Sequence, residues 1–183
     1  MQSKFIHNNI TYTGKELRAG WIRGHTHLEG NAIVAFVGPA DVPIENMVDL
    51  EDIAENAPIY SPLMLHFLAE HFEQNMELAV CRQRLLVVLA CEELERNGVK
   101  TQRSGDDIFV NAKKLSVSIA APARASTCIH FALNIETAGT PVPTSGLNEL
   151  NIIPQDFAQK ILSAYCEEIA QITHATGKVK NLR

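Results

Sequence analysis

Two neighbouring segments with strand-like alternation most tightly constrain how this chain can fold. In residues 112–136, AKKLSVSIAAPARASTCIHFALNIE, apolar residues alternate with small or polar ones over 114–121 and again over 127–136. Because successive side chains of a strand point to opposite faces, this pattern predicts two strands. Each strand is expected to bury its apolar face against helices.

The opposite face of these strands has an unusual composition. The predicted buried face carries Leu115, Val117 and Ile119, followed by Ile129, Phe131, Leu133 and Ile135. The other face carries Lys114, Ser116, Ser118 and Ala120, followed by Cys128, His130, Ala132 and Asn134. Solvated sheet faces usually carry longer residues, so these small ones predict a shallow floor for a slim ligand, with Lys114 and His130 beside it. An ordinary solvated surface is the alternative.

The remaining chain predicts a mixture of strands and helices without regular alternation. Strands are predicted at 9–13, 17–25, 31–37 and 107–111, helices at 62–73, 81–97 and 154–176, and a short acidic helix or turn at 49–56. Pro62 stands at a favoured first helical position, and Gly98 is a typical helix stop. The pattern indicates an α+β fold, with a mixed or antiparallel sheet packed by helices, in a single domain over 1–183.

Composition excludes several classes of protein. The chain has 183 residues, 46% of them hydrophobic, and a net charge of −5, which disfavours nucleic acid as the main partner. The four cysteines form no CxxC pair, which disfavours a disulfide framework or a zinc ribbon. Because no apolar run reaches the roughly 20 residues of a membrane span and no signal-peptide core is present, we expect a cytoplasmic protein without membrane contact.

Three segments resemble those of the lipoate and biotin protein ligase and octanoyl transferase superfamily. DDIFVNAKKLSVSIA (106–120) resembles the segment where a strand and a tight turn lead to the active-site lysine. CIHFALNIE (128–136) is similar to the His-Gly-hydrophobic-Ala-Leu-Asn-Val segment of octanoyl transferases, and VPTSGL (142–147) to their Pro-Cys-Gly-Ile segment. The segments 41–53 and 62–72 resemble an uncharacterised, domain-of-unknown-function branch of this superfamily.

This resemblance implies a fold similar to the biotin/lipoate ligase catalytic domain and an acyltransferase-like or ligase-like activity. Lys114 falls on the family lysine that contacts the acyl carbonyl, and Ser145 falls where octanoyl transferases have the nucleophilic cysteine. The implied catalytic residues are Lys114, Ser145 and His130, and the predicted substrate-binding residues are Ser116, Ser118, Asn134, Arg23, His66 and Glu70. The implied ligand is a small carboxylic acid or its activated acyl form, of lipoyl, octanoyl or biotinyl type, and the implied partner is an acyl-accepting carrier protein.

Three departures from the family pattern leave a second interpretation open. Serine is a weaker nucleophile than the cysteine it replaces at Ser145. Ala112 replaces the turn glycine before the lysine and tolerates positive φ poorly. The Arg-Gly-Gly substrate loop is missing from RAGWIRGHTHLEGN (18–31), so ATP is not supported by a phosphate-binding loop. A non-catalytic relative that binds or senses a cofactor is therefore the alternative to an enzyme.

Histidines and acidic residues suggest two further hypotheses. His25 and His27 are expected to share a face of a strand, and His66 and Glu70 a face of a helix, which would supply ligands for a metal-dependent enzyme. The alternative for His66 and for the nearby His71 is helix packing. The acidic segment 49–56 predicts either a partner surface, a cation site, or a short helix capped by its first aspartate.

Overall fold

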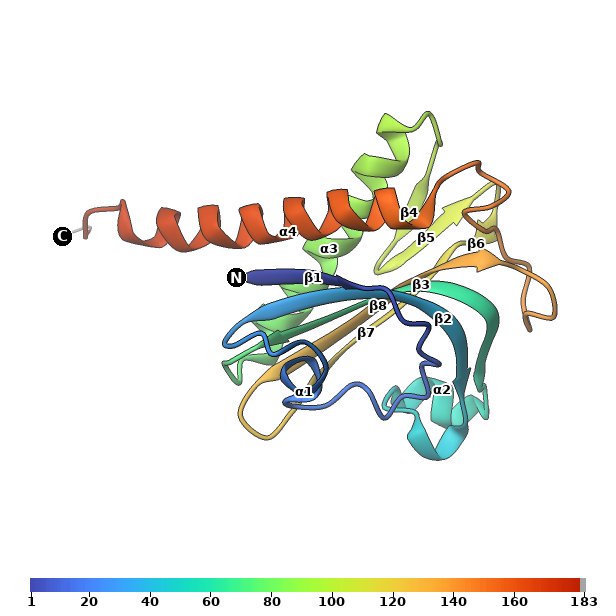
Figure 1. Cartoon of the computed structure of the whole chain (residues 1–183), viewed down its shortest axis with the longest axis horizontal. Helices are drawn as coiled ribbons and strands as arrows, with labels where there is room; N and C mark the ends of the chain where they lie inside the picture. The colour runs from blue at the N-terminus through green and yellow to red at the C-terminus, as the bar shows by residue number, and fades with distance from the viewer. Residues whose placement is uncertain (182–183) are drawn as a thin grey trace.

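A mixed five-stranded sheet organises the chain in the computed structural model, which describes residues 1–181 (Figure 1). Its strands lie in the order β1, β2, β3, β8, β7 and span Gln2–Ile6, Ala32–Val42, Ile59–His71, Thr127–Glu136 and Ser116–Pro122, respectively. β1 pairs with β2 in parallel, and the other neighbouring pairs are antiparallel. The predicted α+β fold with a mixed sheet is confirmed.

Two long helices cover one face of this sheet and bury the larger core (Figure 1). They are α3 (Met76–Arg96) and α4 (Pro154–Gly177), close to the predicted ranges. The Asn75 side chain accepts a 3.0 Å hydrogen bond from the Leu78 backbone N–H, which fixes the N-terminus of α3. The alternate residues predicted to face the helices from β8 all belong to this core: Ile129, Phe131, Leu133 and Ile135.

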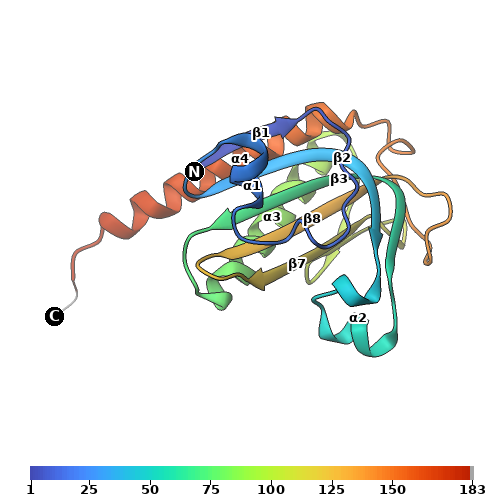
Figure 2. The same ribbon diagram turned by 60° about the horizontal axis from the view of Figure 1, so that its bottom comes forward.

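The N-terminal segment covers part of the opposite face (Figure 2). It contributes α1 (Trp21–Thr26) and a second apolar cluster that includes Tyr12, Phe36 and Leu68. Trp21 packs on Phe36 with 5.8 Å between ring centroids. The sheet is therefore buried on both faces along β2 and β3, while its β7 side borders the cavity described below.

Two short helical elements and a second, smaller sheet complete the fold. They are the 3-10 helix η1 (Ile44–Asn46), α2 (Leu50–Glu55), and a small antiparallel sheet of β4 (Gln102–Ser104), β5 (Asp107–Val110) and β6 (Lys113–Lys114). The Asp49 carboxylate accepts hydrogen bonds from the backbone N–H groups of Glu51 and Asp52 at 2.8 and 3.4 Å. The predicted aspartate cap of a short acidic helix is thus confirmed.

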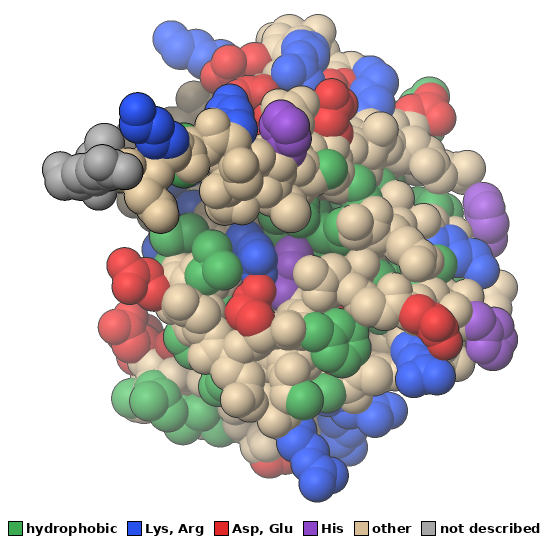
Figure 3. All heavy atoms as spheres, turned by 90° about the vertical axis from the view of Figure 1, so that its left-hand side faces the viewer, with side chains coloured by type: hydrophobic (Ala, Val, Ile, Leu, Met, Phe, Trp, Pro, Cys, Tyr) green, Lys and Arg blue, Asp and Glu red, His purple; other side chains and the backbone are tan. Residues whose placement is uncertain are grey.

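The described surface carries both signs of charge. On the face drawn in Figure 3, acidic and basic side chains are interspersed rather than gathered into one basic area. Among the helices of residues 1–181, none has the length and apolar character needed to cross a membrane.

The helix predicted at 62–73 is wrong, because these residues form most of β3, a central strand of the sheet. Nearly the whole run is apolar because β3 lies between β2 and β8 and is covered on both faces. A short apolar run does not distinguish a strand of this kind from a buried helix. Pro62 is accommodated where the pairing of β2 with β3 shifts register, between the pairs Gly38–Met64 and Ala40–Ser61.

The N-terminal strand predictions are also largely wrong. Residues 17–25 contain no strand, and α1 occupies the second half of this range. His25 lies within α1 and His27 follows its end with a left-handed φ of 61°, so the two histidines do not alternate on a strand. The strand predicted at 9–13 contributes one bridge, between Tyr12 and Ala40, and the sequence pattern does not predict β1.

The two faces predicted for the first alternating segment are exchanged beyond its first residues. Leu115 lies between β6 and β7, and its carbonyl accepts a 2.9 Å hydrogen bond from the Asn134 N–H. After this break, Val117 and Ile119 lie opposite β8 residues of the outer face, and Ile119 pairs with His130. The residues paired with the helix-facing core are Ser116, Ser118 and Ala120. One irregular residue moves every later side chain to the other face, which alternation alone cannot reveal.

A strained turn places β6 beside β5. Asn111 and Ala112 have φ values of 50° and 62°, and the flanking residues Val110 and Lys113 are paired. Two successive residues with positive φ form the tight turn that suits a two-residue hairpin. Since alanine is unfavourable in the left-handed region, Ala112 holds this conformation at an energetic cost, and Lys114 follows two residues later in β6.

We expect Ala112→Gly to raise the free energy of unfolding by roughly 0.5–1 kcal/mol, because glycine removes the penalty of positive φ. Urea denaturation of the two proteins would measure the change. Ala164→Gly, which lies in the middle of α4, is the matched control and should lower stability. A loss of stability in Ala112→Gly would contradict the assigned turn.

Candidate functional site

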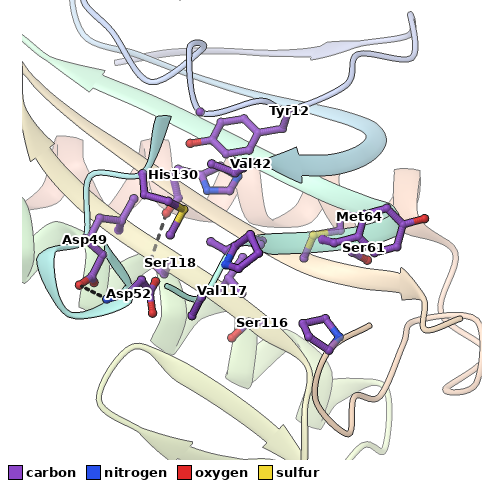
Figure 4. Close-up of a pocket in the computed structure, with 18 of the residues that line it drawn as sticks. Tyr12, Val42, Asp49, Asp52, Ser61, Met64, Ser116, Val117, Ser118 and His130 are labelled. Atoms are coloured by element: carbon purple, nitrogen blue, oxygen red, sulfur yellow. Dashed lines mark hydrogen bonds between the residues drawn. The ribbon is translucent and has the colours of Figure 1, made fainter. Parts of the chain in front are cut away.

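A cavity of about 390 Å³ opens on the outer face of the sheet, between α2, the β5–β6 hairpin and the loop after β8 (Figure 4). Lys114 and His130 both line it, as predicted for the two central residues of the ligand floor. The floor itself differs from the prediction, because its β7 part includes Val117 and Ile119 on the cavity side. The surface beside Lys114 is therefore more apolar than a bare serine and alanine floor.

Lys114 is held at the cavity by backbone pairing and by one carboxylate. Its N–H donates to the Pro143 carbonyl and its carbonyl accepts from the Ser145 N–H, both at 3.0 Å. The Nζ atom lies 3.0 Å from Asp107 Oδ2, and the lysine side chain is 33% exposed. The ammonium group is thus positioned beside the cavity, with part of its hydrogen-bonding capacity free for a ligand.

A chain of hydrogen bonds runs from β2 through two buried histidines to the cavity. His66 Nε2 lies 3.1 Å from the Gly38 carbonyl oxygen, and His66 Nδ1 lies 3.1 Å from His130 Nε2. Because a carbonyl only accepts, His66 carries its proton on Nε2 and donates to Gly38. Its Nδ1 then accepts from the Nε2–H of His130, which leaves His130 Nδ1 as an acceptor.

The surroundings of the two imidazoles keep both neutral. Burial lowers the pKa of His66 to about 4. Burial also lowers the pKa of His130 well below its usual range, and the neighbouring His66 lowers it further. The Tyr12 ring stacks on the His130 ring, with centroids 3.8 Å apart and 9° between the planes. This stack fixes the orientation of the imidazole that lines the cavity (Figure 4).

Asn134 lines the cavity but also has a structural role. Its Nδ2 donates to the Leu115 carbonyl at 3.2 Å, and its Oδ1 accepts from the Ser61 hydroxyl at 3.0 Å. These bonds tie β8 to the irregular residue between β6 and β7 and to the start of β3. The position of Lys114 therefore depends on Asn134.

The predicted serine contacts are largely committed to the protein itself. Ser116 and Ser118 belong to the cavity lining, but the Ser116 hydroxyl accepts from the Ile108 N–H at 2.9 Å. The Ser118 hydroxyl accepts from Gln83 Nε2 at 2.9 Å and donates to the His130 carbonyl at 3.2 Å. These hydroxyls mainly satisfy neighbouring backbone and side-chain groups.

Four predicted site residues lie outside the cavity lining. Ser145 is buried, and the neighbouring Thr144 lines the cavity in its place. Arg23 is exposed and pairs with Glu29 at 3.5 Å. The fourth residue, His66, lies behind His130. Glu70 is buried and accepts hydrogen bonds from the Gly20 N–H and the Ser126 hydroxyl, at 3.0 and 2.8 Å, so it holds loops against the sheet.

The structure contradicts the hypothesis of a metal site formed by His25, His27, His66 and Glu70. His66 and Glu70 do share a face, but on β3 rather than on a helix, and each is occupied by other partners. His25 Nδ1 lies 2.8 Å from the Trp21 carbonyl. Across residues 1–181, no three His, Cys, Asp or Glu side chains are grouped in a way that could hold a metal ion.

His71 packs against a helix, as one alternative expects, but it does so from a strand and not from a helix of its own. It ends β3, and its Nε2 lies 2.9 Å from the Tyr165 hydroxyl of α4. Burial, with a contribution from Arg82, lowers the pKa of His71 to about 4. This histidine joins the sheet to α4 and is not part of the cavity lining.

One side of the cavity is strongly acidic. Asp49 and Asp52 of the α2 region lie together at this side in Figure 4. The carboxylate-bearing residues of the lining are Asp49, Glu51, Asp52, Asp106 and Asp107. Sequence reasoning identified the first of these as a helix cap and did not place Tyr12 or the pair Asp106 and Asp107 at the site. Asp107 lies beside Lys114 because their strands pair in the short β5–β6 hairpin, whereas Tyr12 reaches His130 only through a long-range contact for which the sequence carries no local signal.

The fold defines a class: the domain is built like the catalytic domain of lipoate and biotin protein ligases. A lipoate-ligase-type protein from Thermoplasma acidophilum with bound lipoic acid superposes with a TM-score of 0.63 at 13% identity, over 93% of this chain and 87% of that one. Biotin protein ligase from Aquifex aeolicus superposes with a TM-score of 0.59 at 13% identity, over 92% and 71%. At these identities the likeness concerns the fold alone.

The chain belongs to the family described as Domain of unknown function (DUF366), whose model matches residues 1–180. An uncharacterised protein of Methanocaldococcus jannaschii is 35% identical over 175 residues, which cover 92% of this chain and 79% of that protein. A protein of unknown function from Pyrococcus horikoshi superposes with a TM-score of 0.93 at 34% identity, over 99% of this chain and 100% of that one. The predicted resemblance to a domain-of-unknown-function family is thus confirmed, and the chain shares the fold of the ligases.

We expect the free energy of unfolding to fall as the pH is lowered from about 7 to about 4. The pKa of a histidine in an unfolded chain is about 6.5, whereas the pKa of buried His66 is about 4. Between these values the unfolded chain binds a proton that the native chain does not, so acid favours unfolding. At about 1.4 kcal/mol per pKa unit, His66 alone accounts for roughly 3 kcal/mol.

Urea denaturation at stepped pH would measure this loss in the wild type and in His66→Gln. The variant should lose less stability over the same range, because it has one buried imidazole fewer. His174→Gln, at the exposed end of α4, is the control and should behave like the wild type. An equal loss in His66→Gln would show that the histidine chain is not the source.

Proposed function

We propose that this protein is an acyltransferase- or ligase-like protein that binds the acyl group of a small carboxylic acid, or of its activated form, beside Lys114. The observation that carries the proposal is that Lys114 and His130, from separate strands, line one cavity in a fold shared with lipoate and biotin ligases. The acyl group would be of lipoyl, octanoyl or biotinyl type. An acyl-accepting carrier protein is the proposed partner.

Lys114 and His130 would divide the chemistry between them. The Lys114 ammonium group would donate to the acyl carbonyl oxygen and stabilise the negative charge that develops there when a nucleophile attacks. His130 Nδ1 would accept the proton of the attacking group as the new bond forms, and would return it to the leaving group as the old bond breaks. The Tyr12 stack and the bond to His66 hold His130 in the tautomer that this role needs.

A non-catalytic relative that binds or senses an acyl ligand is the second candidate. The placement of Ser145 favours it, because this residue is buried and Thr144 lines the cavity instead. The low pKa of His130 also makes it a weak base. Under this alternative, Lys114 and His130 bind the acyl group without transferring it.

Removal of the Lys114 amine should weaken acyl binding at least tenfold, because a hydrogen bond from a charged donor contributes about 1.5–3 kcal/mol. The measurement is isothermal titration of the wild type and Lys114→Ala with lipoamide and with octanamide. Lys113→Ala, which removes the adjacent exposed lysine, is the matched control and should bind as the wild type does. Failure of both probes to bind, or unchanged affinity in Lys114→Ala, would reject the proposal.

The role of Ser145 can be tested by mass spectrometry after incubation with p-nitrophenyl octanoate. Since its hydroxyl is not placed in the cavity, we expect no octanoyl adduct on Ser145 and the same products in Ser145→Ala. Thr144→Ala controls for acylation of the half-buried neighbour that lines the cavity. An adduct on Ser145 that disappears in Ser145→Ala would instead establish the covalent route of the octanoyl transferases and exclude the sensing alternative.

A further inference from the structure

The charge of the cavity is unbalanced. Five carboxylates line it, from Asp49, Glu51, Asp52, Asp106 and Asp107, and the cations beside them are Lys114 and Arg84. Lys114 pairs with Asp107 at 3.0 Å, and Arg84 pairs with Asp106 Oδ1 at 2.9 Å. Five negative charges against two positive ones leave an excess of three negative charges. The three carboxylates without a cationic partner among these residues are those of Asp49, Glu51 and Asp52, at the α2 side of the cavity.

The carboxylates that line the cavity repel one another, and burial together with this repulsion raises the pKa of two of them. Burial raises the pKa of Asp52, and the neighbouring Asp49 raises it further. Burial also raises the pKa of Asp106, which Arg84 opposes and Asp107 reinforces. Since like charges in a partly buried site repel, a cation placed among them would relieve that repulsion. An anion would increase it.

An independent feature of the cavity also requires a donor. His130 is only 3% exposed, its Nε2–H is used by His66, and within residues 1–181 its Nδ1 makes no hydrogen bond. The His130 ring lines the cavity, and Nδ1 is the ring nitrogen that His66 leaves for a ligand there. A buried imidazole nitrogen with a lone pair and no partner calls for an N–H or O–H group from a ligand.

We propose that the ligand of this cavity carries a cationic nitrogen, held by Asp49 and Asp52, together with an N–H donor for His130 Nδ1. The class that fits is a small acyl amide with an amine-bearing arm. Its carbonyl accepts from Lys114, its amide N–H donates to His130, and its ammonium group lies among the carboxylates of the α2 side. This inference rests on the proposed function, because it assigns the acyl end of the ligand to Lys114.

A matched series of three probes tests the charge requirement. N-(2-aminoethyl)hexanamide is a cation, N-(2-hydroxyethyl)hexanamide is neutral, and N-hexanoylglycine is an anion, while all three share one acyl amide. Titration calorimetry with the full chain should give the cation at least tenfold tighter binding than the neutral amide, and the anion weaker binding than either. The advantage of the cation should shrink between about 0.02 M and about 0.5 M sodium chloride, because salt screens the attraction.

The double variant Asp49→Asn, Asp52→Asn tests the residues. Asparagine also caps helices, so the first substitution removes the charge of Asp49 and keeps the start of α2. The ratio of the neutral to the cationic dissociation constant should fall from at least ten to near one. Glu55→Gln is the control, since it removes a charge from the same helix at a residue that does not line the cavity, and it should keep the ratio.

A fourth probe, hexylamine, separates this inference from the proposed function. If the neutral amide binds and the cation binds no more tightly, the inference is overturned and the acyl site stands. If hexylamine binds to the wild type but not to the double variant, and the neutral amide does not bind, the cationic site stands and the acyl function fails. Binding of none of the four probes overturns both.

Discussion

The hydrogen-bond chain from Gly38 through His66 to His130 is the constraint on which the cavity depends. It joins β2, β3 and β8 across the outer face of the sheet and fixes which nitrogen of each imidazole carries the proton. Gly38 also lets the N-terminal segment lie close against β2, because a side chain there would meet the Ile10 carbonyl oxygen at 1.9 Å. A cationic His66 would have no acceptor nitrogen for the His130 N–H. The low pKa of His66 therefore keeps this hydrogen bond intact at neutral pH. The N-terminal segment and the sheet thus define a neutral acceptor at the cavity.

The sequence predicts those parts of the fold in which local pattern and tertiary environment agree. The strand at 127–136, the helix at 154–176 and the aspartate cap of α2 are observed as expected, because their periodicity or capping residues suffice. It fails at β3, where burial on both faces removes the alternation that identifies a strand. It also fails at Leu115, where one irregular residue reverses the faces of β7.

The candidate site was predictable only in its two central residues. Lys114 and His130 stand out because a long cation and an imidazole interrupt a run of small side chains, and both line the cavity. Tyr12, by contrast, is more than one hundred residues from His130 in the sequence. A single β-bridge between Tyr12 and Ala40 holds the N-terminal loop where the tyrosine ring can stack on His130. The sequence around Asp49 already accounts for this residue as a helix cap. Its additional place in the cavity lining therefore has no separate sequence signal. Residues with two roles are the ones that sequence reasoning assigns incompletely.

The charges that line the cavity disfavour a free carboxylate as its ligand. A ligand carboxylate beside Lys114 would have to compete with Asp107, which already pairs with the ammonium group at 3.0 Å. It would also add a negative charge to a lining that already has more carboxylates than cations. Desolvating a further anion there is unfavourable, because neither burial nor the neighbours compensate it. An acyl group that arrives as a neutral amide or ester avoids this repulsion, and one that bears an ammonium group is attracted. Under the proposed function, this fold would keep a lysine beside the acyl group while its carboxylates select a ligand that carries a positive charge.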